Sequence, residues 1–321
     1  MLVTDVLEPT SPVPPHDRAS REAALADVPL VSPVPTGGVR GILQHRYLLK
    51  LLVKREVTAR YTGSFLGMLW SYITPLTQFL TYIFIFTLLM GRGGKIEHFA
   101  IHVFCAIMVV GLFTETVAAG TRSIVRNSSL LQKSAMPREM FPLASLLVSL
   151  YHLWPEFVIL GVALFFVGWS PDLTAVAAGV LGYAIIIVFA LALALALSVS
   201  QVFLRDTGNI VAVVNNFIRF GVPMMYPYSI VVDRFRGHTD LYLSNPIADA
   251  VLLVQRCFWV PTTSDPAATA TPTTSPDATA VAAMPAHLFE RGLIALVVAF
   301  VLLVIAQRIF ARYENKMPER L

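Results

Sequence analysis

The chain has 321 residues, of which 56% are hydrophobic and only 14% are charged, and its mean hydropathy is +0.68. Soluble domains carry about 25% charged residues, so this composition excludes a soluble globular protein and predicts an integral membrane protein. The formal net charge is only +4. Basic residues that flank membrane spans set topology and contact lipid, so we expect no nucleic-acid partner.

The N-terminal part of the chain predicts a tail followed by an interface helix. Residues 1–39 are rich in Pro, Asp, Glu and small residues and lack an apolar run long enough for a signal peptide, which is typical of a disordered cytoplasmic tail. In residues 40–63 apolar side chains recur at spacings of three and four, and basic side chains occupy another face. The apolar positions are Leu43, Tyr47, Leu48, Leu51 and Leu52, and the basic ones are Arg46, Lys50 and Lys54. We expect an amphipathic helix in the cytoplasmic interface, with a partly buried soluble helix as the alternative.

A first membrane span is predicted from Leu66 to Met90, because no charge interrupts this segment. A hydrocarbon core of about 30 Å needs about 20 residues in helical conformation. The basic residues before the span place its N-terminal side in the cytoplasm. Polar residues form a stripe on one face of this span, at Ser71, Thr74, Gln78 and Thr81. Such a stripe packs against other helices or lines a wet path, and packing is the simpler interpretation.

A second span is predicted over Phe99–Ala119. It carries Glu115, an acidic residue whose charge is unfavourable at membrane depth. A relay or gate role is one interpretation of this carboxylate. We favour the other, in which Glu115 pairs with a basic residue such as Arg122 one or two turns further on.

The connector after the second span is basic, which places it in the cytoplasm. Its bases are Arg122, Arg126, Lys133 and Arg138. Asn127 or Ser128 is expected to cap a short helix over Leu130–Ala135, which Pro137 ends. The connector is too compact for a domain, and we interpret it as a docking element.

Two further spans follow, over Leu143–Val167 and Ala175–Phe203. The first contains Pro155 and Glu156, and we expect a kink at the proline. The second carries small residues four positions apart, which predict close helix packing. They are Ala190, Ala194 and Ser198.

A fifth span is predicted over Ile210–Tyr228. Asn209, Asn216 and Arg219 lie close to one face of it, with Pro223 a turn later. Arg219 would be strongly unfavourable against lipid, so we expect it to face protein or water.

Residues 229–288 are predicted to lie outside the membrane barrier, before a sixth span over Leu288–Phe310. The apolar stretch 241–259 is too short and interrupted to cross, which favours a re-entrant or interfacial helical hairpin. The Thr/Pro/Ala-rich stretch after it predicts a flexible loop. The fold class is therefore an all-α membrane protein, with a six-helix domain over 64–311, a C-terminal tail over 312–321, and both ends in the cytoplasm.

Motifs for enzymatic chemistry are missing from the sequence. The only approach to a P-loop, Gly91–Lys95, has the wrong spacing, so we expect no nucleotide site in this chain. His98 and His102 share a helical face but have no third ligand beside them, so we expect no metal site. Cys105 and Cys257 lie in apolar surroundings and are interpreted as packing residues.

Four stretches, spread in order over about residues 45–315, form a recognisable set. They are Lys54-Arg-Glu…Arg60-Tyr-Thr-Gly-Ser-Phe-Leu-Gly67…Trp70…Pro75, Asn127-Ser-Ser-Leu-Leu-Gln-Lys133…Pro137-Arg-Glu139…Pro142, Arg205-Asp206, and Asn245-Pro246 with Arg256. Together they resemble the polysaccharide-exporting permeases of ABC transporters, the Wzm and TagG-like members of the ABC type-2 permease family. The N-terminal tail and the Thr/Pro/Ala-rich loop lie outside the resemblance.

This resemblance implies a transport subunit without a cofactor of its own. It implies a homodimer of six-helix subunits in the inner or plasma membrane, with two copies of a separate ATPase that carries ATP and Mg²⁺. The connector would then contact the ATPase, and the short hairpin would form a periplasmic gate or re-entrant element. The implied coupling residues are Leu130, Leu131, Lys133, Met136, Arg138 and Glu139, and the implied gate residues are Asn245, Pro246 and Arg256.

The family's first and fifth spans border the path of a polyprenyl-diphosphate-linked glycan. The residues that this implies for the path are Arg60, Tyr61, Trp70, Ser71, Thr74, Gln78, Thr81, Tyr82, Asn216 and Arg219. The cargo would be a cell-wall galactan, an O-antigen or a teichoic-acid-like polymer. An exporter of drugs or lipids is the alternative, and a membrane-embedded glycosyl- or acyltransferase is a more remote one.

Overall fold

The computed structural model describes residues 45–85, 97–133, 136–235, 238–263, 284–317 and 320. Within these residues the chain forms helices and turns, without a β-strand. The predicted N-terminal tail, the end of the predicted first span and the Thr/Pro/Ala-rich loop lie outside the described residues. The helices are α3 (Arg46–Tyr61), α4 (Trp70–Ile83), α5 (Phe99–Arg126), α6 (Ser128–Lys133), α7 (Met140–Val167), α8 (Leu173–Phe203), α9 (Thr207–Ile218), α10 (Tyr228–Arg234), α11 (Thr239–Tyr242), α12 (Pro246–Phe258) and α14 (Leu288–Tyr313).

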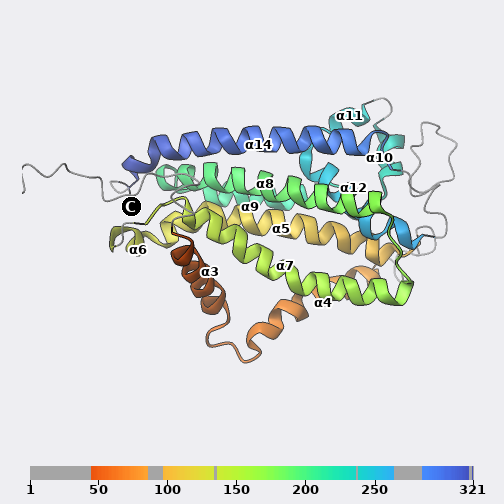
Figure 1. The fold of residues 1–321 in the computed structure, drawn as a ribbon, viewed down its shortest axis with the longest axis horizontal. Coiled ribbons are helices and arrows are strands. Elements are labelled where there is room, and N and C mark those ends of the chain that lie inside the picture. Colours follow the sequence, from red (N-terminus) through yellow and green to blue (C-terminus); the bar gives the residue numbers. More distant parts are fainter. Residues whose placement is uncertain are drawn as a thin grey trace, which may run out of the picture.

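Four described helices are long and apolar enough to cross a membrane, by length and composition. They are Phe99–Arg126, Met140–Val167, Leu173–Phe203 and Leu288–Lys316. These helices correspond to the predicted second, third, fourth and sixth spans. In Figure 1 they run side by side along the long axis of the molecule, and α8 packs against both α5 and α14.

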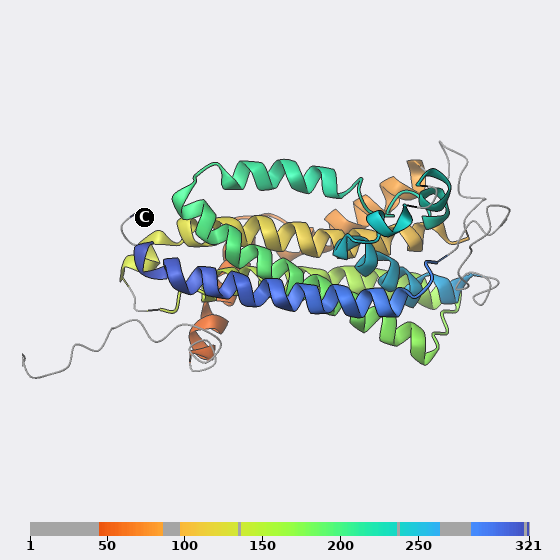
Figure 2. The same ribbon diagram turned by 90° about the horizontal axis from the view of Figure 1, so that it is seen from above.

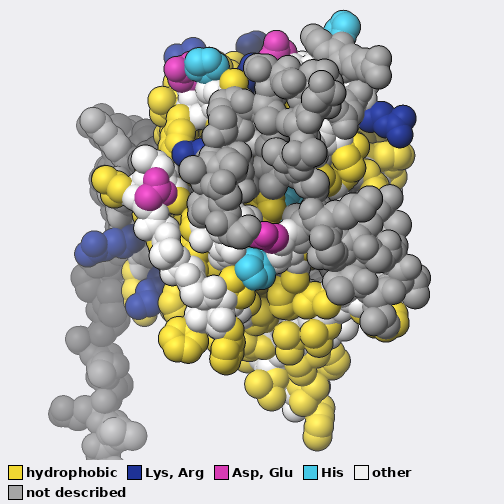
Figure 3. Space-filling view, turned by 90° about the vertical axis from the view of Figure 1, so that its right-hand side faces the viewer, with side chains coloured by type: hydrophobic (Ala, Val, Ile, Leu, Met, Phe, Trp, Pro, Cys, Tyr) yellow, Lys and Arg dark blue, Asp and Glu magenta, His cyan; other side chains and the backbone are white. Residues whose placement is uncertain are grey.

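The core of this bundle forms around α5. In the most apolar part of α5, 72% of the residues are buried, against 22% in α7 and in α14. Large side chains of α5, such as Phe104, Met108 and Phe113, belong to the same buried cluster as Ile185 and Ile186 of α8, and all five are essentially inaccessible. The outer helices instead leave apolar side chains exposed, as expected for a surface whose solvent is lipid. Figure 3 shows such side chains gathered on the lower part of the end where α7 finishes.

The small residues of α8 allow the close packing that the sequence predicts. Ala190, Ala194 and Ser198 are all completely buried. Gly120 of α5 lies directly opposite, where an added Cβ would stand 2.5 Å from the Cβ of Ala194. The two backbones approach closely because neither helix carries a bulky side chain at this point.

The helix α8 begins with a side-chain cap. Asp172 accepts a hydrogen bond from the backbone N–H of Ala175 at 2.9 Å. It also accepts a hydrogen bond from the hydroxyl of Thr174 at 2.5 Å. Both hydrogen bonds lower the pKa of the Asp172 carboxyl below its usual value, and the bond from the Thr174 hydroxyl has the larger effect.

The amphipathic helix is present as α3, but only part of the predicted apolar face is packed. Leu52 is buried against Phe141 and Ala144 of α7. Tyr47 and Leu51 remain 69% and 44% exposed. The packed face is therefore narrower than the predicted one, because α7 covers only one side of the helix.

The predicted first span begins with a 3-10 turn and not with an α-helix. The chain leaves α3 through residues 62–66, with Gly63 at φ +79°, and passes a 3-10 turn at Gly67–Leu69 before α4 begins at Trp70. Glycines at 63 and 67, both with positive φ, favour this break over a helix that starts at Leu66.

The predicted fifth span, Ile210–Tyr228, is not one continuous helix. The helix α9 ends at Ile218, and the next helix, α10, begins only at Tyr228. Gly221, Pro223 and Pro227 lie in between. Proline removes a backbone donor and disfavours the helical region for the residue before it, so the segment cannot continue α9.

The turns gather at the two ends of the bundle (Figures 1 and 2). The basic connector with α6, the α8–α9 turn and the end of α14 share one end, called the connector end below. The short helices α10 and α11 lie at the other end. From there α12 packs against α8, α5 and α14. Its 13 residues span about 20 Å, too short to cross a bilayer.

Candidate functional site

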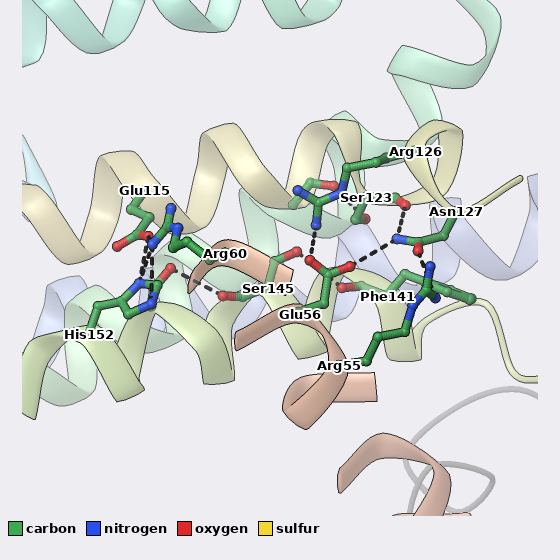
Figure 4. Close-up of polar contacts among 12 residues, drawn as sticks. Arg55, Glu56, Arg60, Glu115, Ser123, Arg126, Asn127, Phe141, Ser145 and His152 are labelled. Carbon is green, nitrogen blue, oxygen red and sulfur yellow. Dashed lines mark hydrogen bonds and ion pairs between the residues drawn. The ribbon is translucent and has the colours of Figure 1, made fainter. Parts of the chain in front are cut away.

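Near the connector end, α3 is attached to α5 by an ion pair. Arg126 donates to one carboxylate oxygen of Glu56, and the amide of Asn127 donates to the other at 3.3 Å. Arg55 donates to the side-chain oxygen of Asn127 at 3.4 Å. Figure 4 shows these four side chains converging from α3 and from the end of α5.

A second polar cluster joins α3, α5 and α7 deeper in the bundle (Figure 4). Arg60 donates to Glu115 at 2.6 Å, and Nδ1 of His152 lies 2.9 Å from the same carboxylate oxygen. Arg60 also lies within hydrogen-bond distance of the His152 ring. Glu115 is 126 − 115 = 11 residues from the end of α5, so it sits about 17 Å along the helix, well inside the bundle.

The predicted pairing of Glu115 with Arg122 is therefore wrong. Arg122 donates instead to the backbone carbonyl of Gly208 at 3.1 Å. On a helix only residues three or four apart face each other closely, and these two are seven apart. Bases from α3 and α7 lie nearer to Glu115 than any base on its own helix.

Glu115 borders a cavity of about 390 Å³ between α4, α5, α7 and the end of α9, called the central cavity below. Three of the predicted path residues line it, namely Thr74, Gln78 and Arg219. Glu156, His152 and Asn215 line it as well. An otherwise apolar bundle thus contains a space with acidic, basic and amide groups, which can hydrogen-bond a polar cargo.

A second cavity of about 410 Å³ lies between α3, α5 and α7 on the connector side, called the connector-side cavity below. Its charged lining residues are Arg55, Glu56, Arg60, Glu115 and Arg126. Glu115 and Ser149 border both cavities. The Arg60–Glu115–His152 cluster therefore stands at the point where the two cavities adjoin.

The polar stripe of α4 lines a groove of about 340 Å³. Trp70, Thr74, Gln78 and Thr81 of the predicted path border it. Ser71 does not border it, and its hydroxyl forms a hydrogen bond with the hydroxyl of Tyr61. The side chain of Tyr82 lies outside the described part of the structure.

On α9 the residue that borders the central cavity is Asn215, the neighbour of the predicted Asn216. Asn216 is exposed and lines neither cavity, whereas Asn215 borders the central cavity and donates to the backbone carbonyl of Thr114 at 3.1 Å. Asn215 and Arg219 are four apart and share a helical face. The four-residue spacing of Asn215 and Arg219 can be read from the sequence, and it could have identified Asn215 as the site residue.

Sequence reasoning also missed His152 as a site residue. His152 and Glu156 are four apart in α7, so one face of that helix carries both titratable groups into the central cavity. Two ionisable residues on one face of an apolar span were the available signal.

Comparison with known proteins identifies the fold family. A model of the ABC-2 type transporter family matches residues 47–251. The chain belongs to the ABC-2 type transporter family. This ABC-2 chain is therefore a multi-pass membrane protein and a transport subunit rather than a catalytic enzyme, and its family implies pairing with an ABC ATPase subunit.

The relatives of this ABC-2 chain are export permeases. It is 31% identical over 224 residues to the O-antigen export system permease protein RfbA of Myxococcus xanthus, which covers 69% of this chain and 84% of that protein. Two proteins of the same name from Klebsiella pneumoniae are also similar. The first is 24% identical over 205 residues, which is 64% of this chain and 77% of that protein. The second is 23% identical over 215 residues, which is 66% of this chain and 80% of that protein. The resemblance to polysaccharide-exporting ABC-2 permeases is confirmed.

The connector of this ABC-2 chain forms the short helix α6 at Ser128–Lys133. Leu130 and Leu131, two of the implied coupling residues, pack inward against Leu52 and Phe141. Glu139 is 2% exposed. Leu130 and Leu131 are half-buried and Glu139 is buried, so these three side chains contribute to the packing of the connector.

The other implied coupling residues differ in their surroundings. Arg138 donates to the backbone carbonyl of Glu314 and so attaches the connector to the end of α14. Met136 is half-buried. The side chain of Lys133 lies outside the described residues.

The implied gate residues form the start and the end of α12. Asn245 caps this helix by accepting a hydrogen bond from the N–H of Ile247 at 3.0 Å, and Pro246 is its first residue. Proline and a capping amide at these positions favour helix initiation. The guanidinium of Arg256 lies 5.4 Å from the ring centroid of Phe289.

Metal ligands do not converge in the described ranges, where no group of three His, Cys, Asp or Glu side chains could hold an ion. His102 is 1% exposed, and its ring lies between the rings of Phe99 and Trp259. Cys105 and Cys257 are free and buried. These residues pack the core of the bundle.

Proposed function

We propose that this chain is the permease subunit of an ABC transporter that exports a polyprenyl-diphosphate-linked polysaccharide. The observation that carries the proposal is the pair of adjoining polar cavities inside an apolar bundle whose relatives are named as O-antigen export permeases. A polysaccharide needs hydrogen-bonding groups where lipid would offer none, and the cavities supply them.

The residues of the proposed path have chemistry suited to such a cargo. The hydroxyl of Thr74 and the amide of Gln78 can hydrogen-bond sugar hydroxyls, and the exposed ring of Trp70 can stack on a sugar face. Arg219 and Arg60 can balance a diphosphate. The polyprenyl chain stays in the bilayer throughout, so its transfer into water is avoided.

Six crossings are part of the proposal. The four long helices form the second, third, fourth and sixth crossings. The first crossing begins with α4, and the fifth consists of α9 and the irregular segment after it. The basic connector and both chain ends then lie in the cytoplasm of an inner or plasma membrane, as basic residues near spans favour. The short α12 serves as the re-entrant element.

Assembly completes the proposal. Two copies of this chain pair with two copies of an ATPase, which binds ATP and Mg²⁺, while this chain contributes no cofactor. The ATPase docks on the connector, where Lys133, Met136 and Arg138 are the proposed contacts and Leu130, Leu131 and Glu139 support them from inside.

Depletion of the protein in its native cells tests the function. We expect lipid-linked polysaccharide to accumulate in the cytoplasmic leaflet while its surface form disappears, measured by glycolipid extraction and by surface labelling of the glycan. A strain with a depleted glycosyltransferase of the same glycan is the matched control, since it loses the surface form without accumulating the precursor. Normal surface glycan after depletion would contradict the proposal.

A further inference from the structure

Three arginines surround the connector-side cavity. Arg55 and Arg60 come from α3 and Arg126 from the end of α5, and the acidic residues in the lining are Glu56 and Glu115. The lining therefore has one more basic than acidic side chain. A positive cavity between membrane helices favours an anionic ligand.

Each arginine has an acceptor from the protein itself. Arg126 is paired with Glu56, Arg60 with Glu115, and Arg55 contacts the side-chain oxygen of Asn127 at 3.4 Å. The side chains of Arg126 and Arg60 are nevertheless 53% and 51% exposed, so they are open to a further acceptor. The Glu56 carboxylate occupies a position at Arg126 that an anion of higher charge could take.

We propose that the connector-side cavity is a binding site for a diphosphate group, and that Glu56 occupies Arg126 while the site is empty. A guanidinium binds phosphate oxygens through two parallel hydrogen bonds, and each phosphate of a diphosphate keeps a negative charge when it is esterified. A diphosphate therefore offers two neighbouring acceptor groups to Arg126 and Arg55, where each carboxylate offers one.

Location supports this assignment. Arg126 is the last residue of α5 and stands at the connector end, where the headgroup of a membrane lipid would lie, and Arg60 stands deeper, beside the central cavity. A diphosphate that replaces Glu56 at Arg126 breaks one of the two ion pairs that join α3 to α5. The lipid source of the diphosphate rests on the proposed function, and free pyrophosphate is the other source.

Binding measurements on the permease–ATPase complex in nanodiscs test the site. The probes are geranylgeranyl diphosphate, inorganic pyrophosphate and geranylgeraniol, titrated calorimetrically. We expect Arg55→Gln and Arg126→Gln each to weaken geranylgeranyl diphosphate binding by about tenfold or more, since each removes a charge-assisted hydrogen bond. We expect Glu56→Gln to strengthen it several-fold, because it removes the internal competitor for Arg126.

Arg46→Gln is the matched control, because it removes the same charge from an exposed position of α3 outside the cavity. It should leave the affinity unchanged. Thermal unfolding of every variant shows that the complexes are folded, and a gain of affinity in Glu56→Gln cannot come from misfolding. The two phosphorylated probes separate the sources: equal binding of both assigns the site to free pyrophosphate, and tighter binding of geranylgeranyl diphosphate assigns it to a lipid headgroup.

The proposal is overturned if both arginine variants bind as the wild type does, if Glu56→Gln binds more weakly, or if geranylgeraniol binds as tightly as its diphosphate. None of these results touches the depletion experiment. Loss of glycan export together with unaltered binding in the variants would remove this site and leave the proposed function standing.

Discussion

Glu115 has partners that its sequence neighbourhood does not contain. Its carboxylate contacts Arg60 of α3 and His152 of α7, so three helices meet at one oxygen atom. An acidic residue at this depth is unfavourable unless it is paired and hydrogen-bonded, and this geometry supplies both. The same cluster borders both cavities, so the residue that stabilises the packing also stands in the proposed path.

A double-mutant cycle distinguishes the observed partner of Glu115 from the one that the sequence suggested. We expect Glu115→Gln to lower the free energy of unfolding by about 1–2 kcal/mol, as loss of a charge-assisted hydrogen bond does. Combined with Arg60→Gln, the effects should be clearly less than additive, because the two changes remove one interaction. The effects of Glu115→Gln and Arg122→Gln on the free energy of unfolding should instead be additive. Denaturation of the purified protein and its variants in detergent measures these free energies. Additive effects with Arg60→Gln would refute the assigned pair.

At the scale of elements, close contact between α5 and α8 depends on residues without bulk. Gly120 faces Ala194 so closely that a single added methyl group has no room. In contrast, α9 ends early because Gly221, Pro223 and Pro227 prevent a continuous helix. Composition therefore controls both where helices approach each other and where they stop.

Two glycine-to-alanine changes test this packing. Gly120→Ala should destabilise the protein by about 1–3 kcal/mol through overpacking, seen as a lower midpoint of thermal unfolding in detergent. Gly161→Ala in α7 is the matched control, because an added Cβ there meets nothing within 4 Å. It should leave the midpoint unchanged or raise it slightly, since alanine favours helix more than glycine does. Equal effects of the two changes would show that the α5–α8 contact has been misjudged.

At the scale of the whole molecule, the turns form two sets at opposite ends of the bundle. The connector end holds α6 and the end of α14, and the other end holds α10 and α11. Membrane insertion must therefore place these two sets on opposite sides. The proposed docking of an ATPase on the connector requires the connector end to be the cytoplasmic one.

Cysteine labelling tests this orientation. Ser129→Cys in α6 and Ser244→Cys after α11 both lie at exposed positions, and the native Cys105 and Cys257 are buried and contribute little background. We expect a membrane-impermeant maleimide added to intact cells or spheroplasts to label Ser244→Cys and not Ser129→Cys. Inverted membrane vesicles should reverse the pattern, and the opposite result would overturn the proposed coupling.

Local sequence determined the membrane character, the positions of the four long helices and the small-residue ridge of α8, because hydropathy and residue size act within one segment. Tertiary structure alone decided that Arg60 and His152 contact Glu115, that Asn215 rather than Asn216 reaches the central cavity, and that Leu130 and Leu131 pack on the cluster of Leu52, Phe141 and Ala144. These outcomes depend on which helices lie side by side and on how each is rotated. Pattern along the chain does not encode either quantity, since a side chain pairs with whatever group the packing brings within hydrogen-bond distance.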